Sequence, residues 1–173
     1  GGIFMSTIKI ENLNFSYYGY VNPVFENVSF SFDTNWKIGL IGRNGIGKST
    51  LFKLLLNQET YQGKISKDVD FIKFPPNLSD TSKLGIELYK ELISDEEEWR
   101  LFRELNLLNV DENLVYRGFE TLSKGEQTKI LLAILFTRED GFLLIDEPTN
   151  HLDMDGRKIV SEYLKNKKGF LLI

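Results

Sequence analysis

The sequence predicts one α/β domain, and three features of the chain carry this prediction. Apolar and polar residues alternate in two N-terminal stretches, which is the period of half-buried strands. An apolar run leads directly into a glycine-rich turn followed by leucines at helical spacing, and farther along a helical pattern again precedes a short apolar strand. The apolar positions of the first two features are Ile8, Ile10, Leu13 and Phe15; Val28, Phe30 and Phe32; Ile38 to Ile41; and Leu51, Leu54 and Leu55.

The bulk composition fits a globular protein and excludes several classes of function. The chain has 173 residues, 42% of them hydrophobic, which suffices for one domain with a core. No stretch approaches the roughly 20 consecutive apolar residues of a membrane span, so we expect no direct membrane insertion. The formal charge of −4 gives no electrostatic case for DNA or other nucleic acid. Cysteine is absent, which excludes disulfides and thiolate metal sites and is compatible with a cytoplasmic location.

The two ends of the sequence carry expectations of their own. Residues 1–4 precede Met5, which begins a natural-looking start, so we expect them to be a cloning remnant; native disordered sequence is the alternative. The domain is then expected to cover residues 5–173. Because the chain stops inside an apolar strand, Phe170 to Ile173, we expect it to have been cut from a longer protein.

Strands and helices alternate through the rest of the chain. A turn around Gly63 is expected to lead to a strand over residues 69–74, and the two prolines that follow end it because proline cannot donate a ladder hydrogen bond. A strand over residues 142–145 and a helix over about 155–167 come later. Gly169 ends that helix before the last strand.

The segment between these strands predicts an inserted helical lobe, about residues 82–137. Its apolar residues recur at helical spacing. Two Ser-x-x-Glu patterns, Ser94 with Glu97 and Ser123 with Glu126, predict capping boxes at the starts of two of its helices.

A glycine-rich pattern after the strand at Ile38 to Ile41 predicts a phosphate-binding P-loop. Glycines let backbone N–H groups wrap around phosphates, and the helix that follows adds a favourable partial charge. Lys48 is expected to reach the β- and γ-phosphates, Ser49 to give its hydroxyl to Mg²⁺, and Thr50 to bond the α-phosphate. The alternative is a glycine-rich turn with a solvated lysine. The pattern consists of Gly42, Arg43, Asn44, Gly45, Ile46, Gly47, Lys48 and Ser49.

An acid pair follows the apolar strand Phe142 to Ile145, at the strand end where α/β sheets bind ligands. Asp146 suits the Mg²⁺ shell, through water, because a hard cation prefers carboxylate oxygen. Glu147 suits the activation of an attacking water. Taken alone, an apolar strand ending in two acids is more often a solvated strand end, and the upstream P-loop reverses that balance.

Two further motifs carry a family resemblance. Leu122 to Gln127 resembles the signature sequence of ABC ATPases, and Asp146 to Asp153 is similar to the extended motif of the ABC-F group, paired-domain ATPases that act on ribosomes. The resemblance covers nearly the whole chain from Ile8. It implies the P-loop NTPase fold of an ABC nucleotide-binding domain, with a mainly parallel core sheet, an N-terminal antiparallel β subdomain and an inserted α-helical subdomain. It also implies ATP and Mg²⁺ as ligands.

The short helical lobe and the segment Thr34 to Lys37 look like the antibiotic-resistance branch of this group. They are similar to the first nucleotide-binding domain of lincosamide and streptogramin A resistance proteins. This resemblance implies a second ABC domain and the ribosome as partners.

The resemblance also implies a residue that stacks on adenine. Tyr17 matches that aromatic position. A strand aromatic in the core is the alternative reading of Tyr17, and Tyr18 is a rival for the stacking role.

Residues of the signature and of the turn after the acid pair would face the partner domain, by the same resemblance. Hydrolysis therefore needs two domains. The signature residues that would bind the partner's ATP are Ser123, Lys124, Gly125 and Glu126. Leu152 and Asp153 would contact the partner's site, and His151 lies in the same turn without a catalytic role.

Three departures from the family pattern stand out. Pro76 occupies the place of the usual glutamine and offers no side-chain oxygen for Mg²⁺. Lys124 replaces a glycine of the signature and is expected to point into solvent. The switch histidine would come just after Ile173, so this fragment is expected to hydrolyse ATP poorly.

Three functions from different classes remain open at this stage. The first is the ATPase domain of a tandem ABC-F protein that binds the ribosome. The second is the ATPase subunit of a membrane transporter, against which the octet from Asp146 and the missing glutamine argue. The third is an ATP-gated binding module that hardly turns over, against which Glu147 argues.

Overall fold

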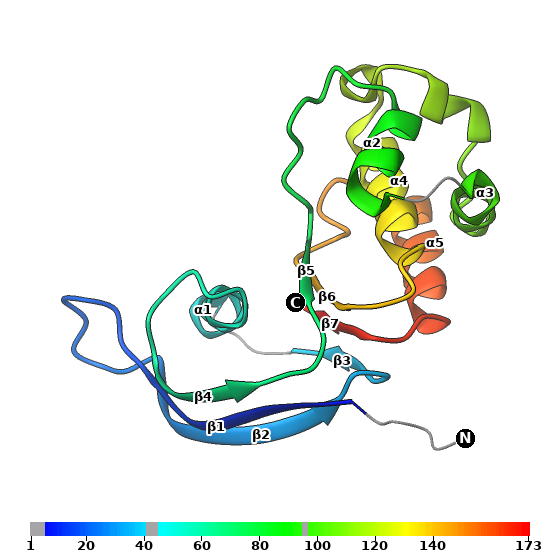
Figure 1. Cartoon of the computed structure of the whole chain (residues 1–173). Helices are drawn as coiled ribbons and strands as arrows, with labels where there is room; N and C mark the ends of the chain where they lie inside the picture. Colours follow the sequence, from blue (N-terminus) through cyan, green and yellow to red (C-terminus); the bar gives the residue numbers. More distant parts are fainter. Residues whose placement is uncertain (1–5, 41–44, 95–96) are drawn as a thin grey trace, which may run out of the picture. The chain divides into compact units, whose positions relative to one another are not determined.

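The computed structural model describes residues 6–40, 45–94 and 97–173, which fall into two compact units (Figure 1). Unit 1 comprises residues 1–72, 141–144 and 168–173, and unit 2 comprises residues 73–140 and 145–167. In the part of the chain that is described, no helix has the length and apolar character needed to cross a membrane.

Unit 1 contains an antiparallel sheet with β1 at its centre, in the order β2-β1-β4. Its strands are β1 (Thr7–Phe15), β2 (Phe25–Asp33) and β4 (Gln62–Ser66). The two predicted N-terminal strands are confirmed. The alternation in β1 is loose because the pairing shifts register between Ile10 and Leu13, where Asn12 has a φ of 50°. On the outer strand β2, Phe30 and Phe32 are two residues apart and share a face, yet Phe32 is 4% exposed and Phe30 is 39% exposed, so the alternation does not predict equal burial.

The prediction of a turn around Gly63 is wrong, because Gly63 lies inside β4. Its φ of 108° is disfavoured for residues with a side chain. A Cβ at this position would lie 2.5 Å from the carbonyl oxygen of Asn12 on the neighbouring strand. The glycine therefore marks the close backbone approach opposite the irregularity in β1, and not a chain reversal.

A second sheet has the strand order β3-β7-β6-β5, and β3 and β7 pair in parallel. Its strands are β3 (Lys37–Gly39), β5 (Phe71–Phe74), β6 (Phe142–Ile145) and β7 (Phe170–Leu172). All four residues of β6 are buried, as expected for a strand covered on both faces. β5 ends directly before Pro75, as predicted.

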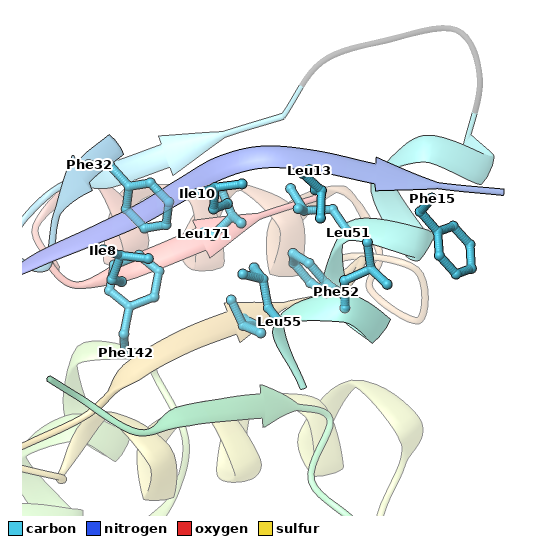
Figure 2. Close-up of a cluster of buried hydrophobic side chains, with 12 residues drawn as sticks. Ile8, Ile10, Leu13, Phe15, Phe32, Leu51, Phe52, Leu55, Phe142 and Leu171 are labelled. Carbon is cyan, nitrogen blue, oxygen red and sulfur yellow. The ribbon is translucent and has the colours of Figure 1, made fainter. Parts of the chain in front are cut away.

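The core of unit 1 lies between the antiparallel sheet and helix α1 (Gly45–Leu55), and Figure 2 shows ten of its residues labelled. Leu51, Leu54 and Leu55 are at most 5% exposed, which confirms the helical face predicted from their spacing. Phe142 packs against Phe32 with ring centroids 5.4 Å apart. The remaining cluster members are Ile8, Ile10, Leu13, Phe15, Phe52, Leu144 and Leu171. This core fixes α1, and with it the P-loop helix start, against the sheet.

Unit 2 is mainly helical. Its elements are α2 (Gly85–Ile93), α3 (Glu98–Leu107), the 3-10 turns η1 (Glu112–Tyr116) and η2 (Phe119–Thr121), α4 (Lys124–Phe136) and α5 (Met154–Lys165). α4 is buried on most of its surface, with Ile130, Leu132 and Ile134 fully inaccessible. It is therefore the central helix of this unit.

One of the two predicted capping boxes is confirmed and the other is wrong. The Ser123 side chain accepts from the Glu126 N–H, and the Glu126 carboxylate accepts from the Ser123 N–H, at the start of α4. Ser94 instead ends α2 in the left-handed conformation, with its N–H donating to the Lys90 carbonyl. α3 begins after Glu97, whose carboxylate pairs with Arg100 at 2.9 Å.

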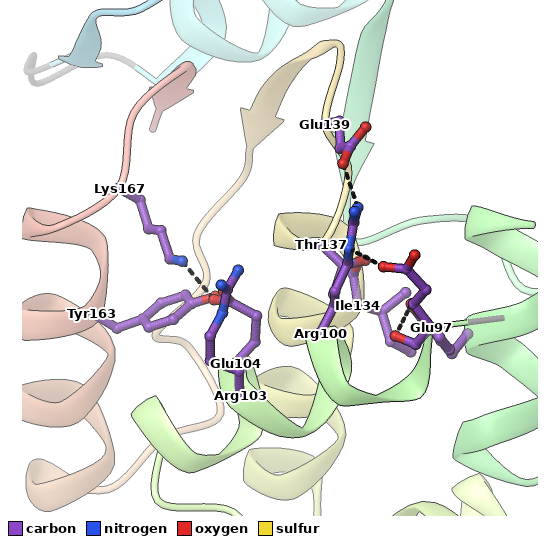
Figure 3. A network of polar contacts seen from close by, with 10 residues as sticks. Glu97, Arg100, Arg103, Glu104, Ile134, Thr137, Glu139, Tyr163 and Lys167 are labelled. Atoms are coloured by element: carbon purple, nitrogen blue, oxygen red, sulfur yellow. Dashed lines mark hydrogen bonds and ion pairs between the residues drawn. The ribbon is translucent and has the colours of Figure 1, made fainter. Parts of the chain in front are cut away.

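A buried carboxylate ties α3 to the end of α5 (Figure 3). Glu104 is 1% exposed, accepts a hydrogen bond from the Tyr163 hydroxyl, and pairs with Lys167 Nζ at 2.6 Å. Burial, and then the negative charge of Glu104, raise the pKa of Tyr163 far above its ordinary value. The phenol therefore stays protonated and remains a donor to the carboxylate.

Candidate functional site

The P-loop leads into α1, and the described part of it lies in the first turns of that helix. Gly42, Arg43 and Asn44 lie outside the described residues. From Gly45 onward the chain is helical, so the backbone N–H groups of the first turn point outward along the helix axis. Ile46 and Ser49 are exposed, Gly47 and Lys48 are half-buried, and Thr50 is buried.

These residues fit a phosphate chain with a hard cation. A Cβ built at Gly47 would meet no atom within 4 Å, so the backbone there borders open space. The Ser49 hydroxyl is an oxygen donor of the kind that Mg²⁺ prefers. Among the described residues, no group of three or more histidines, cysteines or acids is arranged so that it could hold a metal ion. Mg²⁺ in nucleotide sites commonly has one or two protein ligands beside phosphate oxygens and water.

Tyr17 lies against the P-loop helix. Its hydroxyl is 2.9 Å from Oγ1 of Thr50, which is 1% exposed. The Nζ atom of Lys53 lies 5.8 Å from the centre of the Tyr17 ring, and Phe15 packs edge-on against the same ring at 4.8 Å. Tyr18 is fully exposed. Of the two predicted stacking candidates, Tyr17 is the one with contacts to the helix that carries Lys48.

Asp146 follows the buried strand β6 and is half-buried, and its N–H donates to the Phe74 carbonyl of β5. Burial raises the pKa of the Asp146 carboxyl, the negative charge of Glu147 raises it further, and the positive charge of Lys73 opposes the shift. Such a carboxylate gains from a nearby cation, which suits the predicted Mg²⁺ role. Lys73 was not predicted as a site residue, because it belongs to none of the sequence motifs that indicated the site.

Glu147 is exposed and has a φ of 43°, in the left-handed region that residues with side chains seldom adopt. Its Oε2 accepts a 2.6 Å hydrogen bond from the side-chain amide of Asn150. Sequence reasoning missed Asn150, although it belongs to the octet that runs from Asp146.

The loop after β5 contains the predicted departure at Pro76. Phe74 and Pro75 are joined by a cis peptide bond, and Pro76 is half-buried. Because proline has no side-chain oxygen or nitrogen, Pro76 offers no ligand to a metal.

The predicted signature residues begin α4. Ser123 is the exposed N-cap, and Glu126 completes the capping box with it. Lys124 is exposed and its Nζ lies 3.5 Å from the Gln127 amide oxygen. A Cβ at Gly125 would lie 3.4 Å from Leu152 Cδ2, so the turn after the acid pair packs closely on this helix start.

The predicted dimer loop has contacts within its own unit. Leu152 is 7% exposed. Asp153 is the N-cap of α5, where its carboxylate accepts from the Gly156 N–H at 2.7 Å. His151 is exposed.

The predicted site residues gather in two groups, one in each unit. Tyr17 and the residues from Lys48 to Thr50 lie together in unit 1. The acid pair, the signature and the dimer loop belong to unit 2, where the signature and the dimer loop meet at Gly125 and Leu152.

Comparison with known proteins gives the family. Residues 25–150 match the family model described as ABC transporter. ABC transporter F family member 4 of Dictyostelium discoideum is 31% identical over 145 residues, 80% of this chain and 13% of that protein. ATP-binding protein Uup of Buchnera aphidicola is 31% identical over 174 residues, 95% of this chain and 29% of that protein. The chain thus spans less than a third of either of these curated relatives.

A solved structure agrees with this result. A chain described as an inward-facing conformation of a metal-chelate type ABC transporter superposes with a TM-score of 0.73 and 25% identity, covering 98% of this chain and 73% of that one. The predicted mixed α/β fold is confirmed. The chain belongs to the ABC transporter family as a nucleotide-binding domain, and its relatives include proteins named as F family members.

Proposed function

We propose that this chain binds Mg-ATP and hydrolyses it when a second ABC domain faces it. In this proposal Lys48 holds the β- and γ-phosphates, Ser49 and Asp146 serve the Mg²⁺ ion, and Glu147 takes a proton from the attacking water. The observation that carries it is the end of the buried strand β6, where Asp146 is half-buried and Glu147 is exposed. Mg²⁺, when bound, neutralises charge on the phosphates.

The need for a second domain follows from the signature at the start of α4. Ser123 is exposed there, and Gly125 lies in the first turn beside it. A helix start favours an anion, and a partner's γ-phosphate is the anion we assign to it. The isolated domain should therefore turn over slowly.

We further propose that the domain, residues 5–173 with a helical lobe at about 82–137, is the first of two in a cytoplasmic ABC-F protein. The parent would bind ribosomes in its ATP state and act in antibiotic resistance or in translation. The octet Asp146 to Asp153 and the F family relatives support this assignment. A transporter subunit is the second candidate, supported by the likeness to a transporter structure.

Co-sedimentation of the full-length parent tests the proposal. The Glu147→Gln variant should trap the ATP state, and it should pellet with ribosomes only when ATP is present. Lys48→Ala in the same background is the matched control, because it should lose nucleotide binding and with it ribosome binding.

Two other outcomes would each support one of the alternative hypotheses. Recovery with membranes and no ribosome binding would support the transporter subunit. Wild-type parent that binds ATP without hydrolysing it would support the ATP-gated binding module.

A further inference from the structure

Glu147 occupies an unusual backbone position for a catalytic base. Its φ of 43° is one that few non-glycine residues adopt, and it lies two residues after Ile145, where the fully buried strand β6 ends. The side chain is exposed, so packing alone does not fix the direction of its carboxylate. A hydrogen bond to the carboxylate is needed to fix its direction.

Asn150 contacts Glu147 twice, and its side-chain contact supplies that restraint. Its Nδ2 donates to Glu147 Oε2 at 2.6 Å, and its backbone N–H lies 3.4 Å from the Glu147 carbonyl oxygen. The first bond is short and charge-assisted, the stronger class of hydrogen bond. Among the described residues, Asn150 is the hydrogen-bond donor to this carboxylate, and it bonds Oε2.

We propose that Asn150 is a positioning residue for Glu147. By holding Oε2, it aims Oε1 at the water that attacks the γ-phosphate. When that water's oxygen bonds to phosphorus and the bond to the ADP oxygen breaks, Oε1 accepts the water proton and the leaving oxygen takes the bonding electrons. This inference rests on the proposed function, because it assigns Glu147 as the base.

A purely structural role for Asn150 makes a different prediction. If Asn150 only closes the turn, its loss should lower stability and weaken ATP binding and turnover together. A positioning role acts on the chemical step, so kcat should fall while KM stays nearly constant. Measuring kcat and KM therefore distinguishes a positioning role of Asn150 from a purely structural one.

The experiment uses the full-length parent with four variants. Asn150→Ala removes the donor and should lower kcat about tenfold, with KM within about twofold of wild type. Asn150→Asp replaces the donor with a second carboxylate and should cost more. Asn150→Ser retains a shorter donor and should recover part of the loss. Asn166→Ala is the control, because it deletes an amide that donates to a backbone carbonyl elsewhere in unit 2, and it should leave kcat unchanged.

A spectroscopic signal completes the test. In nucleotide-free parent labelled with [¹⁵N]asparagine, one Asn150 amide proton should be shifted downfield and should return to the ordinary position in Glu147→Ala.

Two results would overturn the inference: unchanged kcat in both Asn150→Ala and Asn150→Asp, or kcat and KM that worsen in step with a falling melting temperature. Failure of the proposed function gives a different pattern. In that case wild type shows no ATPase activity, or Glu147→Gln retains it.

Discussion

The hydroxyl of Tyr17 lies within hydrogen-bond distance, 2.9 Å, of the buried hydroxyl of Thr50. One residue comes from the end of the N-terminal sheet and the other from the second turn of the P-loop helix. The hydrogen bond places the Tyr17 ring beside the helix that holds Lys48 and Ser49. We therefore expect the Tyr17 ring to contribute to ATP binding and the Tyr17 hydroxyl to contribute to stability.

Tyr17→Ala should weaken ATP binding about tenfold or more, because base stacking on an aromatic ring contributes about 1–3 kcal/mol. Tyr17→Phe keeps the ring and should change ATP affinity little, while the lost hydrogen bond lowers stability by about 1 kcal/mol. Calorimetric titration with ATP and denaturant unfolding measure the two effects. Tyr18→Ala is the control, and a loss of affinity there instead would assign the stacking role to Tyr18.

Glu104→Ala should lower the free energy of unfolding by about 3–5 kcal/mol, because it leaves Lys167 and the Tyr163 hydroxyl without their buried partner. Urea unfolding of the chain measures this change. Arg103→Ala is the matched control, since Arg103 is 59% exposed and 3.6 Å from Glu104 and should contribute at most about 1 kcal/mol. Equal effects of the two substitutions would contradict the role assigned to Glu104.

Gly63→Ala should destabilise the chain by about 2–4 kcal/mol, since it combines a strained φ with a steric clash at the Asn12 carbonyl. Thermal unfolding measures the loss. Gly39→Ala, in β3, is the comparison, because a Cβ there meets nothing within 4 Å and should cost no more than about 1 kcal/mol. A melting temperature that is unchanged by Gly63→Ala would be inconsistent with the observed register of β4.

Asp146→Asn should raise the melting temperature of the nucleotide-free chain at pH 7. The folded-state pKa of Asp146 is raised, so the folded chain binds the proton more strongly than the unfolded chain does, and ionisation costs stability as pH rises. The gain should shrink as the pH falls towards the ordinary value of 3.8, where both states become protonated. Thermal unfolding between pH 7 and pH 3.8 measures this gain, and a stability change of 1 kcal/mol shifts the melting temperature by about 2–4 °C.

Lys73→Met provides the opposite test of the same electrostatics. The Lys73 charge stabilises ionised Asp146, so its removal should lower the melting temperature at pH 7. If Asp146→Asn and Lys73→Met shift the melting temperature in the same direction, the assigned causes of the pKa shift are wrong.

Local sequence patterns predicted most elements, and their failures have physical causes. Ser123 with Glu126 and Ser94 with Glu97 have the same spacing, yet only the first pair forms a capping box. Ser94 is used instead to end α2, because a residue that can adopt the left-handed conformation is needed there. Which role a serine takes depends on the neighbouring helix, which the four-residue pattern does not contain.

The site shows the same division between local and non-local information. Motifs with fixed spacing gave Lys48, Ser49 and the acid pair as candidates, and their roles stay predictions. The strand β4 was missed because its residues are mostly polar and exposed, and its glycine is explained only by the neighbouring strand. The influence of Lys73 on Asp146 likewise depends on the pairing of β5 with β6, which no linear motif encodes.

The position of β7 in its sheet has a consequence for folding. β7 comes last among the strands of the described residues, yet it lies between β3 and β6. β3 therefore pairs with β7, a strand about 130 residues away in the sequence. A contact of such high sequence separation slows folding. During synthesis at about 5–20 residues per second, the β3 edge stays unpaired for about 7–26 seconds, and an unpaired strand edge favours aggregation during that interval.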